Sequence, residues 1–487
     1  MSRHKVIDVF AGPGGLNEGF ASLEGGTVFD IAGSFEMDDA AISTLTTRAT
    51  QRILQQDGAG SQSHRRLLRG EIDLAGFRAH ADVEGAWAEA SAHVHQVELG
   101  PSTRVDSDAL ISSALGKEPG PWVLIGGPPC QAYSLAGRSR RVNDAAFEDD
   151  VKHFLYREYL NILERFQPSV FVMENVKGML STTHGGTRLF DRILSDLSRV
   201  GRRYRIRSLT VKNGSVADPR DFVVRAEHHG VPQARHRVIL VGIRDDLPLE
   251  AHRAWRPLER RADQLTVRDA LSDLPALRSR LTPKGDDSWD AWARVRAEAF
   301  AAAERPRPRD VAMGVGGPWV GSVERPVSRQ VAAGYLDWVR RDIGGFAHHE
   351  TRGHMAADLR RYAYLANLAT EDKVLSVHDL PEAFRPSHAN IGKESRPFAD
   401  RFRVQRWGRP SSTVVSHLAK DGHYFIHPDP DQMRSVTVRE AARLQSFPDD
   451  YWFAGNRTKQ YQQVGNAVPP FLARQIASRV ADVLDRA

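Results

Sequence analysis

The first segment of the chain constrains the fold more than any other. An apolar run at Val6–Phe10 is followed by the glycine-rich stretch Ala11–Gly15 and then by helical spacing over Leu16–Leu23. This order is typical of a strand, a tight turn and a helix. Glycine lets the backbone of such a turn approach a ligand, and the helix N-terminus offers free N–H groups. The segment therefore predicts a ligand site at the end of the first strand.

Further apolar runs alternate with segments of helical spacing along the first half of the chain. The runs lie at 28–35, 122–125, 169–173 and 238–243, and the helical segments at 39–54, 107–115, 154–166 and 190–200. Apolar strands that alternate with helices indicate βαβ units and a buried parallel sheet. We therefore expect an α/β fold with a doubly wound sheet.

The pattern changes after Ile243. Residues 244–433 lack regular alternation and predict a second, irregular domain, whereas regular spacing resumes over 434–487. Four arginines lie within nine residues of this region, with no acid among them: Arg401, Arg403, Arg406 and Arg409. Such a strip is a candidate for DNA phosphate or base contacts, and a solvated loop is the alternative.

Cys130 is the only cysteine among 487 residues. One cysteine forms neither an internal disulfide nor a CxxC zinc site, so we expect a cytoplasmic protein without a metal. The longest uncharged stretch, 119–137, is rich in proline and glycine, which suits neither a membrane helix nor a signal peptide. A net charge of +6 permits a nucleic-acid partner but fits an arginine-rich surface equally well.

Cys130 itself stands in a loop bounded by glycine and proline, directly after the apolar run at 122–125. A lone cysteine is more often a small buried residue than a nucleophile. Here, however, the thiol follows the carboxyl end of a predicted strand, where open α/β sheets bind ligands. The two prolines before it would restrain the backbone and present the side chain.

Two further segments carry polar groups next to predicted strands. Glu174 follows four apolar residues, so partial burial would suit it to proton donation, although a solvated acid is the alternative. Arg235 and Arg237 occupy alternate positions before the run at 238–243. Two guanidinium groups on one face are suited to recognise a base or a phosphate, and ordinary surface charge is the alternative.

The remaining motifs are weaker. Glu36 follows a short apolar strand about twenty residues after the glycine turn, where doubly wound folds place an acid on ribose hydroxyls. Nicotinamide, flavin and S-adenosylmethionine proteins share this arrangement, and Asn17 departs from the usual third glycine. Thr437 and Glu440 form a capping box that predicts a helix. Gly465-Asn466 also precedes a helix.

In this order, the segments resemble the DNA (cytosine-5)-methyltransferase family. The resemblance rests on the glycine turn after Phe10, Pro-Pro-Cys-Gln, Glu-Asn-Val, Gln-x-Arg-x-Arg, Thr-x-Arg-Glu and the terminal Gly-Asn-x-x-Pro-Pro, which together span Val6 to Pro470. It implies a methyltransferase fold over 1–243, a target-recognition domain over 244–433, and a segment at 434–487 that returns to the catalytic domain.

The resemblance also implies a reaction. Cys130 would attack C6 of a flipped-out cytosine, Glu174 would hold and protonate N3, and Arg237 with Arg235 would bind O2. The methyl group would come from S-adenosyl-L-methionine. The residues that the family places around this cofactor are Phe10, Gly12, Gly14, Glu36, Met37, Pro129, Leu155 and Asn466.

One cofactor position has two candidates. The family carries an acid after the third strand to read the adenine amine, and both Glu98 and Glu71 could serve. Glu98 is preferred because it precedes the predicted helix at 107–115 in the expected order. Residues from about 56 to 95 would then be an insertion without an assigned role.

Three functions compete at this stage. The leading one is sequence-specific methylation of double-stranded DNA by a monomer, as the modification partner of a restriction endonuclease that need not contact it. A tRNA-modifying branch shares the cysteine and glutamate motifs, but the long recognition region favours DNA. A catalytically silent DNA-binding module is the third.

Overall fold

The structure is a computed structural model of the 487-residue chain. It describes residues 3–56, 62–129, 152–181, 183–184, 187–211, 218–282, 286–304, 308–309, 312–323, 332–386 and 401–487. Within this part of the chain, no helix combines the length and the apolar character that a membrane crossing requires.

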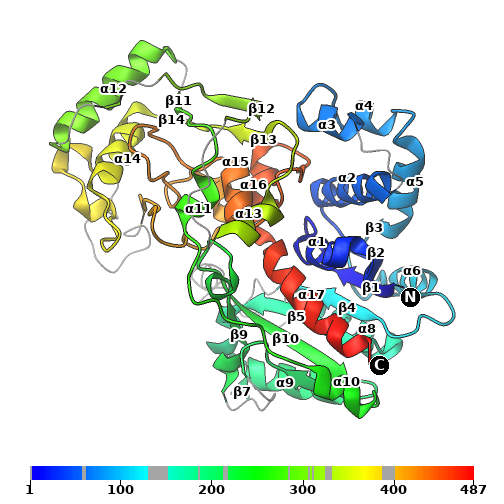
Figure 1. The fold of residues 1–487 in the computed structure, drawn as a ribbon. Coiled ribbons are helices and arrows are strands. Elements are labelled where there is room, and N and C mark those ends of the chain that lie inside the picture. The colour runs from blue at the N-terminus through cyan, green and yellow to red at the C-terminus, as the bar shows by residue number, and fades with distance from the viewer. Residues whose placement is uncertain are drawn as a thin grey trace.

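An eight-stranded sheet forms the centre of the first half of the chain (Figure 1). Its order is β3-β2-β1-β4-β5-β10-β8, with β9 paired to β10. The strands are β1 (His4–Val9), β2 (Phe29–Glu36), β3 (Val94–Gln96), β4 (Val123–Gly126), β5 (Val170–Val176), β8 (Tyr204–Arg207), β9 (Val223–Arg225) and β10 (His236–Arg244). The strands β1 to β5 pair in parallel, which confirms the predicted doubly wound α/β fold.

The strand β10 departs from that prediction, because it runs antiparallel to both β5 and β8. The chain reaches β10 from β9 through a single short 3₁₀ turn at Ala226–His229. A parallel return needs a crossover of a dozen or more residues, whereas a short connection brings the chain back antiparallel. The expectation of a parallel sheet was therefore wrong at this strand.

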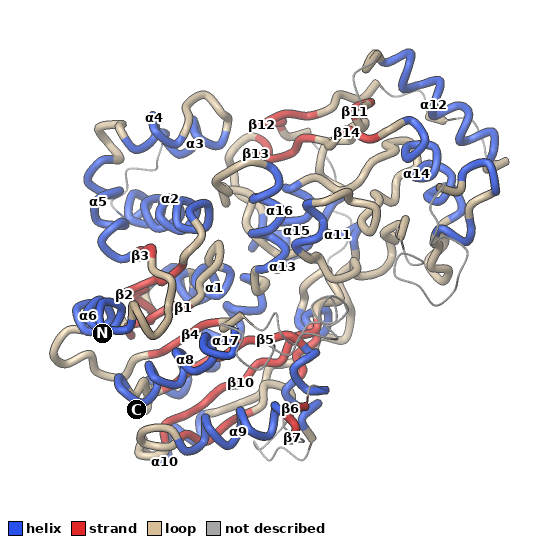
Figure 2. The backbone as a smooth tube through the Cα atoms, turned by 180° about the vertical axis from the view of Figure 1, so that it is seen from behind, coloured by secondary structure: helices blue, strands red, loops and turns tan. Residues whose placement is uncertain are grey.

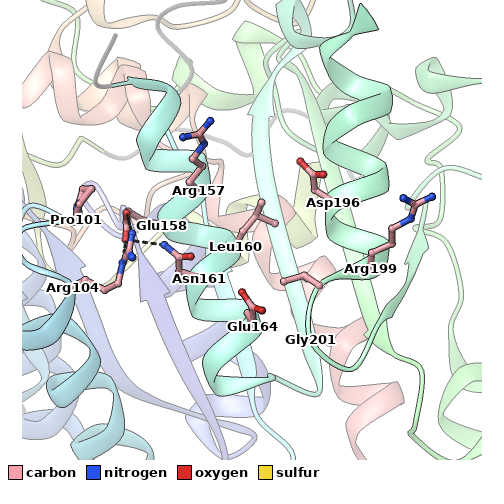
Figure 3. A pocket seen from close by; sticks show the side chains of 11 residues that line it. Pro101, Arg104, Arg157, Glu158, Leu160, Asn161, Glu164, Asp196, Arg199 and Gly201 are labelled. Carbon is pink, nitrogen blue, oxygen red and sulfur yellow. Dashed lines mark hydrogen bonds and ion pairs between the residues drawn. The ribbon is translucent and has the colours of Figure 1, made fainter. Parts of the chain in front are cut away.

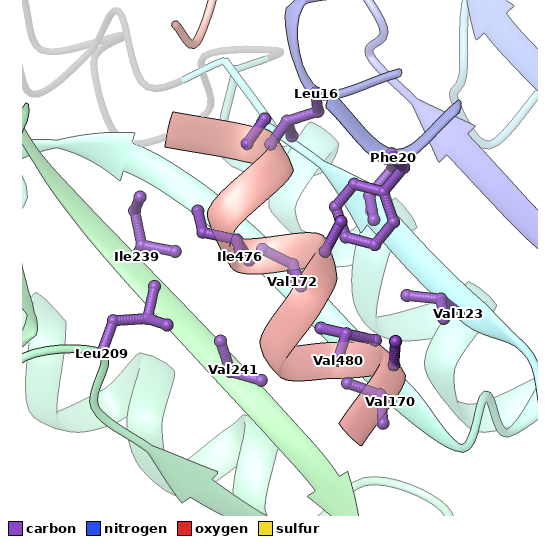
Figure 4. Close-up of a cluster of buried hydrophobic side chains, with 14 of the residues drawn as sticks. Leu16, Phe20, Val123, Val170, Val172, Leu209, Ile239, Val241, Ile476 and Val480 are labelled. Atoms are coloured by element: carbon purple, nitrogen blue, oxygen red, sulfur yellow. The ribbon is translucent and has the colours of Figure 1, made fainter. Parts of the chain in front are cut away.

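Alternation along the strands divides the core into two layers. Val6, Val172 and Val241 face one side of the sheet, which is covered by α1 (Gly15–Ala21) and α17 (Pro470–Leu484). Ile7 and Phe171 face the other side, under α6 (Arg104–Leu115), α8 (Lys152–Phe166) and α9 (Leu189–Arg199). Figure 4 shows the first layer, with Ile476 and Val480 of α17 pointing at the strand side chains. The last helix of the chain thus completes the fold of its first half.

The helices between β2 and β3 form a small layer of their own. They are α2 (Asp39–Gln56), α3 (Gln62–Leu68), α4 (Leu74–Arg78) and α5 (Glu84–His93). Leu54, Leu67, Phe77 and Val83 form their core, against which Trp452 from the C-terminal segment packs. The segment for which the sequence predicted an insertion thus folds into three short helices after α2.

The region after β10 contains short elements and long loops. Its helices are α10 (Leu249–Ala254), α11 (Val267–Leu271), α12 (Trp289–Ala302), α13 (Ala333–Val339) and α14 (Ala356–Leu368). Its strands are β11 (Arg280–Leu281), β12 (Gly316–Gly321), β13 (Gly345–Glu350) and β14 (Gly353–His354), which pair as β11 with β14 and β12 with β13. Two helices then lead back to α17, namely α15 (Val438–Leu444) and α16 (Arg457–Asn466). Figure 2 shows the small strands and α12 well apart from the central sheet.

Candidate active site

The predicted site residues gather where the parallel strands end. Glu36 ends β2, and Phe10 follows β1. Glu174 lies near the end of β5, and the loop that leads to Cys130 leaves β4 after Gly126. Cys130 itself lies outside the described residues. Parallel strands present their carboxyl ends at one edge of a sheet, which is where open α/β folds bind ligands.

The loop before Cys130 is anchored to β5. The Asn175 side-chain amide donates a hydrogen bond to the carbonyl of Pro128 over 3.2 Å. A Cβ atom at Gly127 would come within 3.0 Å of the Glu174 Oε2 atom, so the backbone there passes close to the carboxylate. The residues directly before the cysteine are thus held beside Glu174.

Glu174 and Arg237 form the charged centre of this edge. Alternation places Glu174 on the same face as Val172, and Arg237 on the same face as Ile239. The antiparallel register sets Glu174 opposite Ile239, which brings the Arg237 Nε atom to 2.8 Å from Glu174 Oε1. Both side chains are mostly buried, at 12% and 16% exposed. Arg237 fills one of the roughly four acceptor positions of the carboxylate, so Glu174 keeps capacity to accept a hydrogen bond from a ligand.

Arg235 does not share this arrangement. Its guanidinium donates to the main-chain carbonyls of Val414 at 2.8 Å, Gly465 at 3.2 Å and Asn466 at 3.4 Å. The side chain is 1% exposed, and burial lowers its pKa well below the ordinary value. These contacts give Arg235 a bridging role between three segments in place of the base contact expected from the sequence.

The glycine turn and Glu36 form one unit. One oxygen of the Glu36 carboxylate accepts the N–H of Gly12 at 2.7 Å, and the other accepts the N–H groups of Met37 and Asp38 at 2.8 and 3.0 Å. Gly12 adopts a φ of +56°, and a Cβ atom there would meet nothing within 4 Å. Phe10 also has a positive φ, of 55°. The turn therefore leaves open space beside Glu36.

The other cofactor candidates differ in exposure. Met37 is a large apolar side chain that is 58% exposed next to Glu36. Asn466 is exposed at the end of α16, and Leu155 is half-buried in the first part of α8. Pro129 follows the anchored Pro128. The space beside Glu36, with an exposed apolar side chain at its rim, fits a nucleoside and its hydroxyls.

The structure separates the two acids proposed for the adenine amine. Glu98 is exposed and lies two residues after β3, whose exit is tied to β2 by a hydrogen bond from Val97 N to the carbonyl of Glu36 at 2.9 Å. Glu71 instead follows α3, where it faces Arg66 and Arg69 at 3.7 Å. Only Glu98 lies at the edge that carries Glu36.

The arginine strip is partly used within the protein. Arg406 donates to the carbonyl of Glu371 at 2.8 Å, Arg409 pairs with Asp372 at 3.0 Å, and Arg401 lies 3.7 Å from Asp421. Arg403 is half-buried, and its side chain has no ion-pair partner in the described part of the chain. Arg403 is therefore the member of the strip best placed to meet an outside phosphate.

A surface cavity of about 550 Å³ lies away from this edge, between α6, α8 and α9 (Figure 3). Its walls include the Arg104–Glu158 ion pair at 2.7 Å, together with Arg157 and Arg199. None of the predicted site residues lines it. No group of three or more metal-ligating side chains occurs in the described ranges.

Two residues near the site were missed by sequence reasoning. Asn175 was not singled out, although a polar residue directly after Glu174 at a strand end could have drawn attention to it. Tyr451 was missed because nothing in its local sequence connects it with the glycine turn, to which its hydroxyl donates a hydrogen bond.

Fold and site together define a doubly wound α/β protein with open space beside the Glu36 carboxylate and a Glu–Arg pair near the segment that leads to Cys130. A model of the family "C-5 cytosine-specific DNA methylase" matches residues 108–306 and 342–482, and the chain belongs to that family. Its enzyme class is DNA (cytosine-5-)-methyltransferase, as the sequence predicted.

Known proteins resemble the chain over nearly its whole length. The type II methyltransferase M.Bpa9945I of Bacillus paralicheniformis is 33% identical over 493 residues, which cover 99% of both chains. The DNA (cytosine-5-)-methyltransferase M.ApeKI of Aeropyrum pernix is 26% identical over 537 residues and 100% of both chains. A crystal structure of a prophage-encoded DNA modification methyltransferase from E. coli superposes with a TM-score of 0.53 at 21% identity, covering 99% of each, which supports the fold.

Proposed function

We propose that this protein methylates C5 of a flipped-out cytosine in double-stranded DNA through a covalent bond between Cys130 and C6. The observation that carries the proposal is the Glu174–Arg237 pair behind the anchored Pro128 loop, at the edge where the parallel strands end. Arg237 leaves other acceptor positions of this carboxylate unfilled, and a ligand at the open edge can supply donors for them.

Each of the three residues has one task in this proposal. The Cys130 thiolate adds to C6, which makes C5 nucleophilic as part of an enamine. Glu174 protonates N3 and accepts from the exocyclic amine, so that negative charge does not build up on the ring. Arg237 donates to O2 and holds the carboxylate in place. After C5 has taken the methyl group of the donor, release of the C5 proton to water, expulsion of the thiolate and return of the N3 proton to Glu174 would restore the aromatic ring.

We propose S-adenosyl-L-methionine as the methyl donor, which supplies an electrophilic methyl group on its sulfonium. The space beside Gly12 and the Glu36 carboxylate fits its ribose. Met37, Glu98, Leu155 and Asn466 would border the adenine and close the pocket, with Phe10, Gly14 and Pro129 shaping its floor.

Duplex DNA is favoured as the substrate over RNA. The target base must leave the helix for Cys130 to reach C6, at a cost of a few kcal/mol. The long region between β10 and α15 offers the surface for reading base edges, with Arg403 as a candidate phosphate contact. We further propose that the protein acts as a cytoplasmic monomer and modifies the site of a restriction endonuclease.

Radiolabelled methyl transfer tests the proposal. Wild type, Cys130→Ala and a control, Asp108→Asn, are incubated with labelled cofactor and either duplex DNA or tRNA. We expect label in DNA with wild type and the control, and none with Cys130→Ala. Label in tRNA alone, or full transfer by Cys130→Ala, would overturn the assignment. Bisulfite sequencing of DNA from expressing cells then gives the site, and resistance of that DNA to endonucleases that cut there tests the restriction role.

A further inference from the structure

The glycine turn is supported from behind by a residue near the other end of the chain. The Tyr451 hydroxyl donates a hydrogen bond of 2.5 Å to the carbonyl of Pro13, across 438 positions of sequence. Tyr451 is 1% exposed, and Pro13 is buried as well. The contact therefore satisfies a main-chain acceptor inside the turn that water cannot reach.

Tyr451 also limits the shape of the turn by contact. Gly14 has a φ of +89°, and a Cβ atom there would lie 3.0 Å from the Tyr451 hydroxyl and 2.8 Å from Leu45 Cδ2. A Cβ at Gly12, by contrast, would meet nothing within 4 Å. The turn is thus packed on the side of Tyr451 and open on the side of Gly12, where the cofactor would lie.

A buried charge cluster ties the helix after the turn to the same loop. The Arg48 Nε atom donates to Glu18 of α1 at 2.8 Å, and another guanidinium nitrogen lies 3.2 Å from Asp450. Gln51 donates to Asp450 at 2.8 Å. Arg48 also lies over the Tyr451 ring, 5.0 Å from its centre. Loop 449–451 therefore holds both the turn and the first helix.

That loop is itself held firmly. Asp449 N donates to the carbonyl of Val339 in α13 at 2.7 Å, and Arg439 donates to the carbonyl of Tyr451 at 2.7 Å. The support behind the turn is therefore set by packing against the region after β10. A support of this kind can keep the turn in one shape before a ligand arrives.

We propose that Tyr451 is a positioning residue for the cofactor, which acts by holding the Pro13–Gly14 peptide in the shape that binds S-adenosyl-L-methionine. The inference rests on the proposed cofactor site. Without the hydroxyl, the turn gains freedom that cofactor binding must remove, so affinity falls. The groups that act on cytosine are untouched, so the rate at saturating cofactor changes little.

Tyr451→Phe removes only the hydroxyl, and Tyr204→Phe is a matched control. The Tyr204 hydroxyl also donates to a proline carbonyl, that of Pro168, at 3.0 Å, and its side chain is 3% exposed. Pro168 lies just before β5, at the amino ends of the parallel strands, whereas the glycine turn lies at their carboxyl ends. Both variants lose a buried hydrogen bond of the same kind, so both are expected to unfold at a lower temperature.

Cofactor affinity separates the two variants. Calorimetry with S-adenosyl-L-methionine alone is expected to give a Kd about tenfold higher for Tyr451→Phe, and methylation of duplex DNA a matching rise in KM for the cofactor. The kcat of Tyr451→Phe should stay within about threefold of wild type. Tyr204→Phe should bind the cofactor like wild type. Hydrogen exchange of the 11–19 segment should quicken in Tyr451→Phe alone.

Equal cofactor affinity in the two variants, or wild-type affinity in Tyr451→Phe, would overturn the inference while leaving the proposed function in place. A wild-type protein that binds no S-adenosyl-L-methionine would instead refute the cofactor assignment, and the inference with it.

Discussion

Two parts of the molecule use buried charge in opposite ways. At the carboxyl edge of the sheet, Glu174 pairs with Arg237 alone among the described residues and keeps acceptor capacity for a ligand. At the junction of α15, β13 and the 432–435 segment, charged groups are surrounded by partners. Arg434 contacts Glu440 through two bonds of 2.6 Å and also reaches Gln432 and the carbonyl of Leu277.

The difference teaches that burial alone does not mark a functional arginine. Arg235 and Arg237 are two residues apart on the same segment, and both are buried to a large extent. Arg235 is held by main-chain carbonyls, so it joins segments, whereas Arg237 faces a carboxylate at an open edge. The two roles differ in whether the charged group, with its partner, can still form a hydrogen bond to a ligand.

The largest effect should follow from Glu174→Gln. The amide cannot protonate N3, so we expect kcat for DNA methylation to fall about 10²- to 10⁴-fold, with little change in unfolding temperature. Asp108→Asn is the matched control, because Asp108 pairs with Arg165 at 3.2 Å and is 9% exposed, but lies on α6. Steady-state kinetics and thermal unfolding of both variants check this.

A Glu174→Gln variant that keeps its methylation rate but unfolds at a lower temperature would contradict this prediction. Glu174 would then contribute to stability, as the charged groups of the junction do, and not to catalysis. The same conclusion would follow if Asp108→Asn lost activity to the same degree.

The second prediction concerns the junction. Arg434→Met leaves the buried Glu440 carboxylate without its cation, so the free energy of unfolding should fall by about 3–5 kcal/mol. Urea denaturation measures this change. Adding Glu440→Gln to the variant removes the unpaired charge while keeping an oxygen that can accept from Thr437 N. The double variant should therefore be more stable than Arg434→Met alone. A double variant of equal or lower stability would contradict the claim that the unpaired Glu440 charge causes the loss.

The sequence predicted well what depends on local pattern. The strand and helix positions, the glycine turn and the placement of Glu36, Glu98 and Glu174 at one edge of the sheet follow from periodicity and from the rule that parallel strands end together. The reversal of β10 was missed because apolar periodicity does not report strand direction.

Partners that are distant in sequence could not be read from it. Arg235 donates to Asn466, 231 positions away, and Tyr451 to Pro13, 438 positions away. Their local sequences predict only an arginine before a strand and an aromatic residue after a helix. Which carbonyl each one meets is decided by how α15, α16 and α17 return to the sheet, and this depends on packing of the whole chain.

The smallest expected effect is a loss of folding stability at low pH. His349 lies in the junction, with its ring nitrogens 2.9 Å from Thr437 Oγ1 and from the carbonyl of Pro275. Burial lowers the pKa of His349 from 6.5 to about 4. The folded protein therefore keeps this ring neutral while the unfolded chain takes up a proton, so stability is full above pH 6.5 and declines as the pH falls toward 4. The total loss from this one group is about 3 kcal/mol.

Unfolding free energies measured by urea at several pH values should show the decline, and His349→Gln should reduce its slope by up to one proton. An unchanged slope in that variant would mean that the junction tolerates charge at this position as the open edge does.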